Sequence, residues 1–260
     1  MPRPPARAVV ASAFSAGVVL TASACSSVAG LGTVGPGLRA SASSASPGAA
    51  SHAPVAAPTL TEAQARAALI SEDDLGEPWV PTEGFATWRE TMLKARTESR
   101  ACGRLLDALY AEDLFGPDAS TRASIGLDDA WDGAQMRYQI VAHRPEDVDR
   151  TLAWLGGLPD ECGRFTATAR GGQLAVEVTE APMPRVGDAG QALRIVLSGI
   201  SEYGDAPTLT LDVAAVRVGD DAITVTNGGL GEVSADATWT AVELGAHRLA
   251  EARKQGRRTI

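Results

Sequence analysis

Short apolar runs separated by Gly- and Asp-containing turns fill most of the chain after residue 164, and they limit its possible folds more than any other feature. Such runs predict strands, and short turns join strands that run antiparallel. With two earlier runs included, strands are expected at 124–127, 135–142, 165–170, 174–179, 192–200, 208–218 and 222–226. The sequence therefore predicts an antiparallel sheet of about five to seven strands.

Four segments have the apolar spacing of amphipathic helices. The first follows Thr61, a capping residue, and extends to the acidic run before Gly76. The second contains Cys102, and the third begins at Pro145 and ends at the glycine pair 156–157. The last helix begins near Ser234. We expect these helices to pack against one face of the sheet and to complete an α+β domain over residues 59–260.

The first 24 residues have the three parts of a secretory signal peptide. Arg3 and Arg7 supply a positive start, and residues 8–19 are uncharged and mostly apolar. That run is shorter than the roughly 20 apolar residues that a membrane-spanning helix needs. The sequence therefore predicts a signal peptide at 1–24 and a protein that works outside the cytoplasm.

Two processing routes fit the end of this signal. Ala22, Ser23 and Ala24 form an A-x-A site, where signal peptidase would release a secreted protein. The same residues before Cys25 resemble a bacterial lipobox, although its usual leucine is replaced by Ala22. Residues 25–58 are rich in Ala, Ser, Gly and Pro, which predicts a disordered tether. Because a tether is useful when its far end is fixed, we expect lipid attachment at Cys25 on the extracytoplasmic face of the cell membrane.

The charge of the exported chain makes some partners unfavourable. The 23 Lys and Arg residues become 21 once Arg3 and Arg7 are removed, against 32 Asp and Glu. An acidic surface does not favour nucleic acid, whose phosphates bind basic patches. Basic residues gather near the C-terminus, where they complement a helix dipole or contact anionic headgroups or polymers: Arg248, Arg253, Lys254, Arg257 and Arg258.

Cysteine usage agrees with export. If Cys25 carries lipid, Cys102 and Cys162 remain, an even number in an oxidising compartment, which predicts one disulfide. The alternative, a thiol nucleophile or a metal site, would need a neighbouring histidine or further ligands. The folded part contains only His143 and His247, and it has no C-x-x-C motif.

Two segments resemble ligand-binding motifs but differ in detail. Residues 128–133 (DDAWDG) begin like a calcium loop, yet Ala130 occupies the third position and Gln139 the place of the bidentate glutamate. We interpret them as a hairpin connection. Residues 227–231 (NGGLG) lie between a strand and a helix, as a phosphate-binding loop does. No further strand follows that helix, so we interpret them as a turn. Neither a metal nor a cofactor is expected.

The sequence contains no recognisable catalytic motif. It lacks the G-x-S-x-G serine elbow. His143 precedes Arg144 and Pro145 in a loop, and His247 falls on the exposed side of the last helix. Neither histidine has a nearby partner in the sequence that would make it a general base. We therefore expect a protein that is not an enzyme.

Tryptophans offer the remaining candidates for a binding site. Trp154 and Trp239 occupy core-facing helical positions. Trp79 and Trp131 fall in loops, where exposed aromatic side chains often line a ligand groove, with packing under the sheet as the alternative. We take Trp79 and Trp131 as candidate ligand-cleft residues.

The order of these features resembles the extracellular sensor domain of mycobacterial PknH-type serine/threonine kinases, which also occurs in many stand-alone lipoproteins. The resemblance covers roughly residues 60–253 and rests on LTEAQARAALISEDDLGEPW, CGRLLDAL, QMRYQIVAHRPEDVDRTLAWLGGLPDEC, VRVGDDAITVT and AHRLAEAR. It implies an antiparallel sheet with helices on one side, a broad cleft for an unidentified ligand, and no catalysis. The family pattern has two disulfides, whereas this chain can form one.

Three functions follow as hypotheses. The first is a cell-surface binding or sensor domain for an unidentified cell-envelope ligand; since no kinase domain precedes it, a signal would pass to a partner protein. The second is a carrier or assembly factor for envelope lipids or glycans. The third is an exported hydrolase, for which the sequence names no residues. A shallow polar cleft favours the sensor, and a deep apolar pocket favours the carrier.

Overall fold

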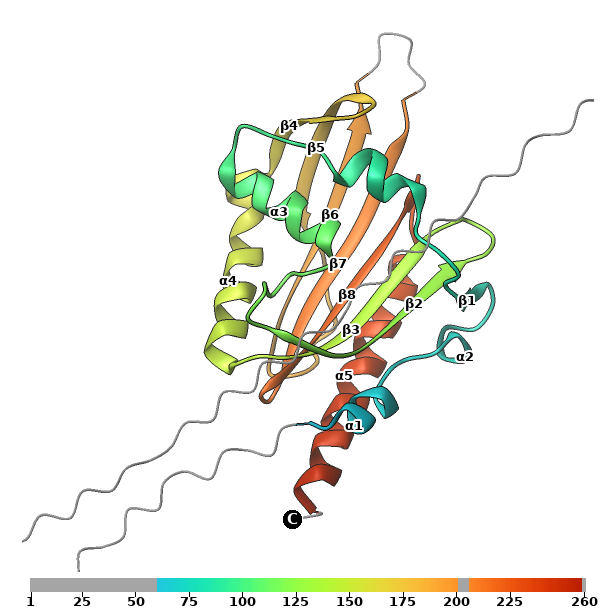
Figure 1. Ribbon diagram of the computed structural model, residues 1–260, viewed down its shortest axis with the longest axis vertical. Helices are drawn as coiled ribbons and strands as arrows, with labels where there is room; N and C mark the ends of the chain where they lie inside the picture. Colours follow the sequence, from blue (N-terminus) through green and yellow to red (C-terminus); the bar gives the residue numbers. More distant parts are fainter. Residues whose placement is uncertain (1–59, 201–205, 259–260) are drawn as a thin grey trace, which may run out of the picture. The chain divides into compact units, whose positions relative to one another are not determined.

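One antiparallel sheet of eight strands organises residues 60–200 and 206–258, the part of the chain that the computed structural model describes (Figure 1). The strand order across the sheet is β1-β2-β3-β8-β7-β6-β5-β4. The strands are β1 (Trp79–Pro81), β2 (Ser120–Asp129), β3 (Gln135–Ala142), β4 (Arg164–Ala169), β5 (Gly172–Glu180), β6 (Ala189–Gly199), β7 (Thr208–Val218) and β8 (Asp221–Leu230). The α+β class and the antiparallel sheet are confirmed, with slightly more strands than expected. The expected signal peptide, Cys25 and tether lie outside the described residues.

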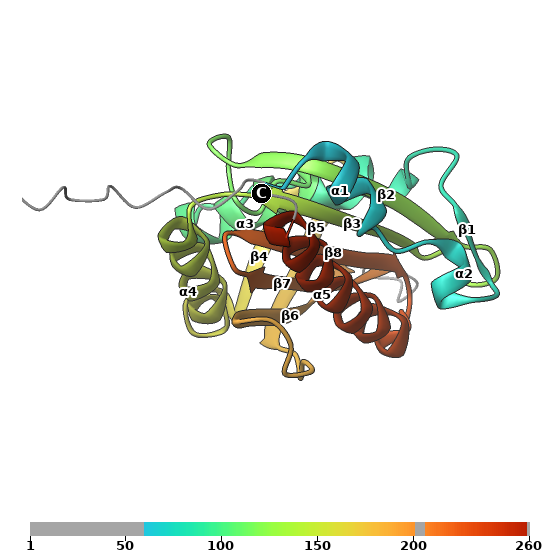
Figure 2. The same cartoon turned by 90° about the horizontal axis from the view of Figure 1, so that it is seen from below.

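Helices cover both faces of the sheet, which corrects the expectation of a single covered face. They are α1 (Glu62–Ala67), α2 (Glu72–Leu75), the π-helix η1 (Arg89–Leu93), α3 (Arg100–Ala111), α4 (Pro145–Cys162) and α5 (Ala235–Arg258). One core cluster joins α3, α4 and η1 to one face of the sheet. A second joins α1 and α5 to the other face, and Figure 2 shows α1 beside α5.

Apolar residues on both sides of the central strands explain the two covered faces. Along β7, Leu211 and Val213 pack in the cluster with α4, whereas Ala214 and Val216 pack in the cluster with α5. Successive side chains of a strand point to opposite faces, so β7 is buried on both sides. A nearly continuous apolar run of this kind is the usual mark of a strand between two layers.

Three expected element boundaries are wrong. The first helical segment consists of two helices: α1 ends at Ala67, and α2 begins at Glu72. Helix α4 continues through the glycine pair 156–157 and ends at Cys162. Residues 227–230 belong to β8 rather than to a turn. A side chain at Gly228 would place its Cβ 2.3 Å from Leu211 and 2.9 Å from Trp88, so glycine is needed there for close packing.

The disulfide joins the two helices that cover one face. Cys102 on α3 and Cys162 at the end of α4 are bonded, with 5.5 Å between their Cα atoms. Both residues are buried in the same core cluster as Leu105 and Leu158. The bond therefore fixes α3 against α4 above the sheet.

Ion pairs within the fold occupy much of the C-terminal basic cluster. Arg248 forms a bidentate pair with Asp74 and donates to the carbonyl of Leu69. Arg253 pairs with Asp220 and Asp221. These arginines hold α5 to α2 and to the turn between β7 and β8, so they are not available for anionic headgroups or polymers.

The contact between α5 and β3 gives a first prediction. Tyr138 is fully buried, and a Cβ at Gly245 would lie 2.4 Å from its hydroxyl oxygen. We expect Gly245→Ala to lower the free energy of unfolding by about 1–3 kcal/mol, because overpacking moves side chains away from their preferred rotamers. Urea unfolding measures the change.

Gly157→Ala on α4 is the matched control, because no atom lies within 4 Å of its added Cβ. Alanine favours a helix over glycine, so this variant should gain up to about 1 kcal/mol. A Gly245→Ala protein as stable as the unmodified one would contradict the packing of α5 on Tyr138.

Candidate functional site

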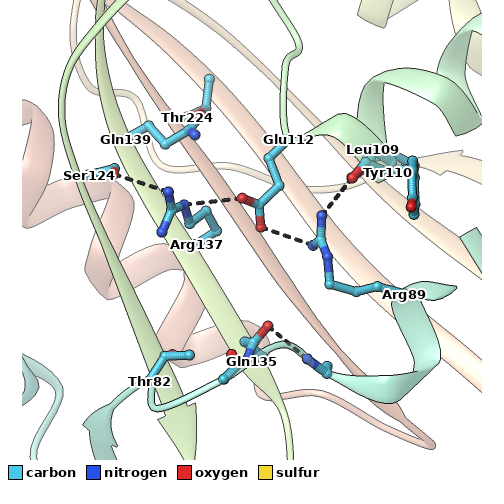
Figure 3. Close-up of polar contacts among 12 residues, drawn as sticks. Thr82, Arg89, Leu109, Tyr110, Glu112, Ser124, Gln135, Arg137, Gln139 and Thr224 are labelled. Atoms are coloured by element: carbon cyan, nitrogen blue, oxygen red, sulfur yellow. Dashed lines mark hydrogen bonds and ion pairs between the residues drawn. The ribbon is translucent and has the colours of Figure 1, made fainter. Parts of the chain in front are cut away.

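A polar groove lies where the end of α3 meets β2, β3 and β8 (Figure 3). It is formed by Arg89, Glu112, Ser124, Gln135, Arg137, Gln139 and Thr224, and the name polar groove refers to these residues below. Along β3, Met136, Tyr138 and Ile140 belong to the core cluster with α5. Because strand side chains alternate, Gln135, Arg137 and Gln139 face the opposite side, toward α3.

Glu112 is the central residue of the groove. It caps the C-terminus of α3 with a left-handed backbone, at φ 54°. Its Oε1 lies 3.0 Å from Nη1 of Arg89, and its Oε2 lies 3.3 Å from Nε of Arg137. Arg89 also donates through Nη2 to the carbonyl of Tyr110, at 2.8 Å. One carboxylate thus links α3, η1 and β3.

Side-chain hydrogen bonds order the floor of the groove. Nη2 of Arg137 donates to Oγ of Ser124 at 3.1 Å, and the Thr224 hydroxyl donates to Oε1 of Gln139 at 3.0 Å. Nε2 of Gln135 donates to Asp128 Oδ1 at 2.9 Å. These polar side chains are held in place by protein contacts, and a preordered site loses less entropy when a ligand binds.

The groove contains two cavities that share Glu112 and Arg137. The larger measures about 270 Å³ and is also bordered by Phe115 and Gln139. The smaller measures about 40 Å³ and is bordered by Trp88 and Gln135, among others. Both are open to solvent; the larger is lined mainly by polar groups, whereas the smaller has a mixed lining.

Two buried donors at the smaller cavity have no hydrogen-bond partner among the described residues. They are Nε1 of Trp88 and Nε of Arg137, whose contact with Glu112 is ionic and lacks hydrogen-bond geometry. Buried polar groups are almost always hydrogen-bonded in native proteins. Both nitrogens are covered by protein atoms, so a ligand in the cavity would reach them only after a movement of neighbouring side chains.

The tryptophans singled out in the sequence do not come together here. Trp79 begins β1 and is buried in the core cluster with α5, which corrects its assignment to a loop and supports packing under the sheet. Trp131 lies in the β2–β3 connection and is 74% exposed. Neither borders the two cavities of the polar groove.

The acidic run has a structural role in the hairpin between β2 and β3. Oδ1 of Asp129 accepts hydrogen bonds from the backbone amides of Trp131 and Asp132, both at 2.9 Å. The carboxylate therefore caps the turn, in agreement with a hairpin connection. Among the described residues, no group of three or more His, Cys, Asp or Glu side chains is arranged to hold a metal ion.

The histidines do not form a catalytic arrangement. Nε2 of His143 lies 3.7 Å from Oδ2 of Asp147, beyond hydrogen-bond distance. That carboxylate already accepts from Arg144 at 2.6 Å. His247 is exposed on α5.

No helix in the described ranges combines the length and the apolar character that a membrane crossing requires.

Comparisons with known proteins give likenesses of fold. No family model matches the sequence, and no curated protein matches it. The extracellular domain of PknH from Mycobacterium tuberculosis is similar over 76% of this chain and 99% of its own, with 12% identity and a TM-score of 0.45. The Mog1 E65A mutant is similar over 55% of this chain and 85% of its own, with 10% identity and a TM-score of 0.24. At such values neither likeness bears on identity or function.

Proposed function

We propose that this protein is an exported, lipid-anchored domain of the cell surface that binds a polar ligand of the cell envelope without chemically changing it. The polar groove is its binding site, and Cys25 carries the lipid. The observation that supports this most directly is the open cavity of about 270 Å³ beside Glu112 and Arg137, whose polar lining is held in place by protein contacts.

The chemistry of the groove favours a ligand rich in hydroxyl groups. At the larger cavity the Nε2 of Gln139 can donate and the carboxylate of Glu112 can accept, and sugar hydroxyls can do both. Phe115 supplies an apolar wall to the larger cavity. A glycan segment of the cell envelope matches this combination, with one sugar hydroxyl or carbonyl placed against Arg137.

The carrier hypothesis has less support. A carrier of acyl chains needs an apolar cavity of several hundred Å³, as ligand sites usually have. The cavity of this size with the most apolar lining, about 410 Å³ over β4, β5 and β6, is wide open to solvent and is bordered by Arg164 and Glu177 as well as by Phe165. The polar groove instead agrees with a sensor or binding domain, which would pass any signal to a partner protein.

A binding experiment tests the groove. The probe is the mixture of glycan fragments that muramidase releases from bacterial cell walls, observed by saturation-transfer NMR with the full chain carrying Cys25→Ser. We expect specific signals from sugar protons, and Arg137→Gln should weaken binding about tenfold, since a hydrogen bond to a charged group contributes about 1.5–3 kcal/mol.

Arg164→Gln is the control for this experiment. Arg164 also lies on a strand and pairs with a carboxylate, that of Glu177, but it is exposed and does not border the groove. Binding that falls equally in both variants, or no binding at all, would reject the glycan proposal for this groove.

The anchor is tested separately. With lipid on Cys25, the protein should sediment with membranes, and mass spectrometry should find a diacylated N-terminal cysteine. Cys25→Ser should move the protein to the soluble exported fraction, because the lipid and not the folded domain holds it. An unmodified chain that begins at or after Cys25 in culture medium would show secretion instead.

A further inference from the structure

A further cavity, lined by arginines, shares Phe115 with the polar groove. It measures about 440 Å³, within the range of small-molecule sites. Phe115 borders both this cavity and the larger cavity of the groove. The walls come from α3, the α3–β2 connection, the β3–α4 connection and α4. We call it the arginine pocket and define it by Arg104, His143, Arg144, Arg150 and Trp154.

Positive charge exceeds negative charge around the arginine pocket. Arg104, Arg144 and Arg150 line it together with two carboxylates, those of Asp118 and Asp147. The full chain carries a net charge of −9, so a local excess of cations is unusual for this protein. Because cationic clefts concentrate anions, the charge balance favours an anionic ligand here.

Asp147 is already occupied by its own neighbours. It accepts from Arg144 and from Arg150, which lie on either side of it at the start of α4. Burial raises the pKa of the Asp147 carboxyl, but the hydrogen bond from Arg144 and the charges of Arg144 and Arg150 outweigh burial and hold the pKa below its usual value. One carboxylate anion thus faces two guanidinium groups, which keep further N–H donors free.

Arg104 provides the clearest free cation. Its guanidinium lies 4.0 Å from the centre of the Trp154 ring, and it has no ion pair or hydrogen bond with a carboxylate in the described ranges. Stacking on a ring uses the face of the guanidinium and leaves the N–H groups at its edge available. These N–H groups suit the paired oxygens of a phosphate or carboxylate.

The His143 side chain completes the lining. It is only 9% exposed, and its nearest polar contact is Asp147 Oδ2 at 3.7 Å. No hydrogen bond to its imidazole is found within residues 60–200 and 206–258. A largely buried imidazole with unused ring nitrogens can donate to an anion, and it can do so from both nitrogens when protonated.

We propose that the arginine pocket binds the phosphate group of a small ligand. Arg104 and Arg150 donate to the phosphate oxygens, His143 provides a further donor, and Trp154 and Phe115 flank the organic part. This site is distinct from the polar groove, so the proposal does not depend on glycan binding there.

Titration with inorganic phosphate and pyrophosphate tests the proposal. The full chain carrying Cys25→Ser is followed by ¹⁵N NMR and calorimetry. We expect saturable binding, with the largest shifts at the backbone amides of residues 143, 144 and 146–151 and at the Trp154 indole. Arg104→Gln should weaken it about tenfold or more, the loss expected for a charge-assisted contact. Because Arg104 is exposed, this variant should remain folded.

Arg66→Gln is the matched control, since Arg66 is an exposed helical arginine on α1 that pairs with Glu62. Equal weakening by both variants would mean that net charge alone attracts the anion, and the proposal would be wrong. No saturable binding of either anion, or shifts confined to other parts of the molecule, would also overturn it.

Lipid vesicles distinguish two sources of the phosphate group, a lipid headgroup and a soluble phosphate ester. Phosphatidylglycerol vesicles that bind the protein through Arg104, while phosphatidylcholine vesicles do not, would identify a lipid headgroup. Saturable binding of phosphate without binding to these vesicles would identify a soluble phosphate ester. Either result, added to saturable binding of phosphate or pyrophosphate, supports the site, and the vesicles decide only the source of the phosphate group.

Discussion

Replacing Cys102 and Cys162 together by alanine will lower the free energy of unfolding by about 4 kcal/mol. The two residues are 60 positions apart. A bond across a loop of that length restricts the unfolded chain, and the chain-entropy model gives about 4 kcal/mol for the restriction. Folded domains are stable by only about 5–15 kcal/mol, so the variant should lose a large part of its total stability. Urea unfolding in a Cys25→Ser background measures the difference.

Reducing the disulfide of the unmodified protein separates two contributions to stability, the restriction of the unfolded chain and the packing of the two sulfur atoms. Both cysteines are buried, so alanine also removes two sulfur atoms from the core. A reductant breaks the bond but leaves those atoms in place. We expect reduction to produce most of the effect of the double substitution. A reduced protein that unfolds at the same urea concentration as the oxidised one would show that α3 and α4 are held mainly by their apolar contacts.

The sequence predicts the sheet well because strand alternation is a local signal. Met136, Tyr138 and Ile140 alternate with polar neighbours, and the structure places all three in one core cluster. The number of covered faces depends on tertiary packing. In β7, apolar residues on both sides of the strand indicate two layers of helices, although antiparallel sheets are commonly covered on one face only.

Glycine is a poor guide to element boundaries in this chain. The pair at 156–157 predicts a helix end, but α4 continues because Leu155 and Leu158 are buried on either side of it. Gly228 suggested a turn, whereas it permits close packing of Trp88 and Leu211 against β8. In both places tertiary contacts decide the conformation, and their cause lies outside the local sequence.

The polar groove could not be recognised from the sequence. Gln135, Arg137 and Gln139 look like the solvent-facing side of any half-buried strand. They face a groove only because the end of α3 lies above them, with Glu112 reaching Arg89 and Arg137 from a distant part of the chain. The sequence contains no signal for such a contact, since the three residues share no motif.

The second large effect that we expect is a loss of stability when Glu112 is replaced by alanine. Its carboxylate faces Arg89, whose side chain is 9% exposed, and removal of one member of a buried ion pair is strongly destabilising. Arg89 keeps its hydrogen bonds to the carbonyls of Leu109 and Tyr110, so Glu112→Ala should lose about 3 kcal/mol, the lower end of the usual range.

The left-handed backbone at Glu112 allows a sharper comparison. At φ 54° any residue with a Cβ is strained by about 1 kcal/mol relative to glycine. Glu112→Gly removes the strain together with the ion pairs, so it should lose only about 2 kcal/mol and remain more stable than Glu112→Ala. Glu177→Ala, which removes an exposed carboxylate paired with Arg164, should leave stability nearly unchanged. A glycine variant as stable as the unmodified protein would mean that the ion pairs only offset the backbone strain, and that Glu112 does not hold α3 and η1 to the sheet.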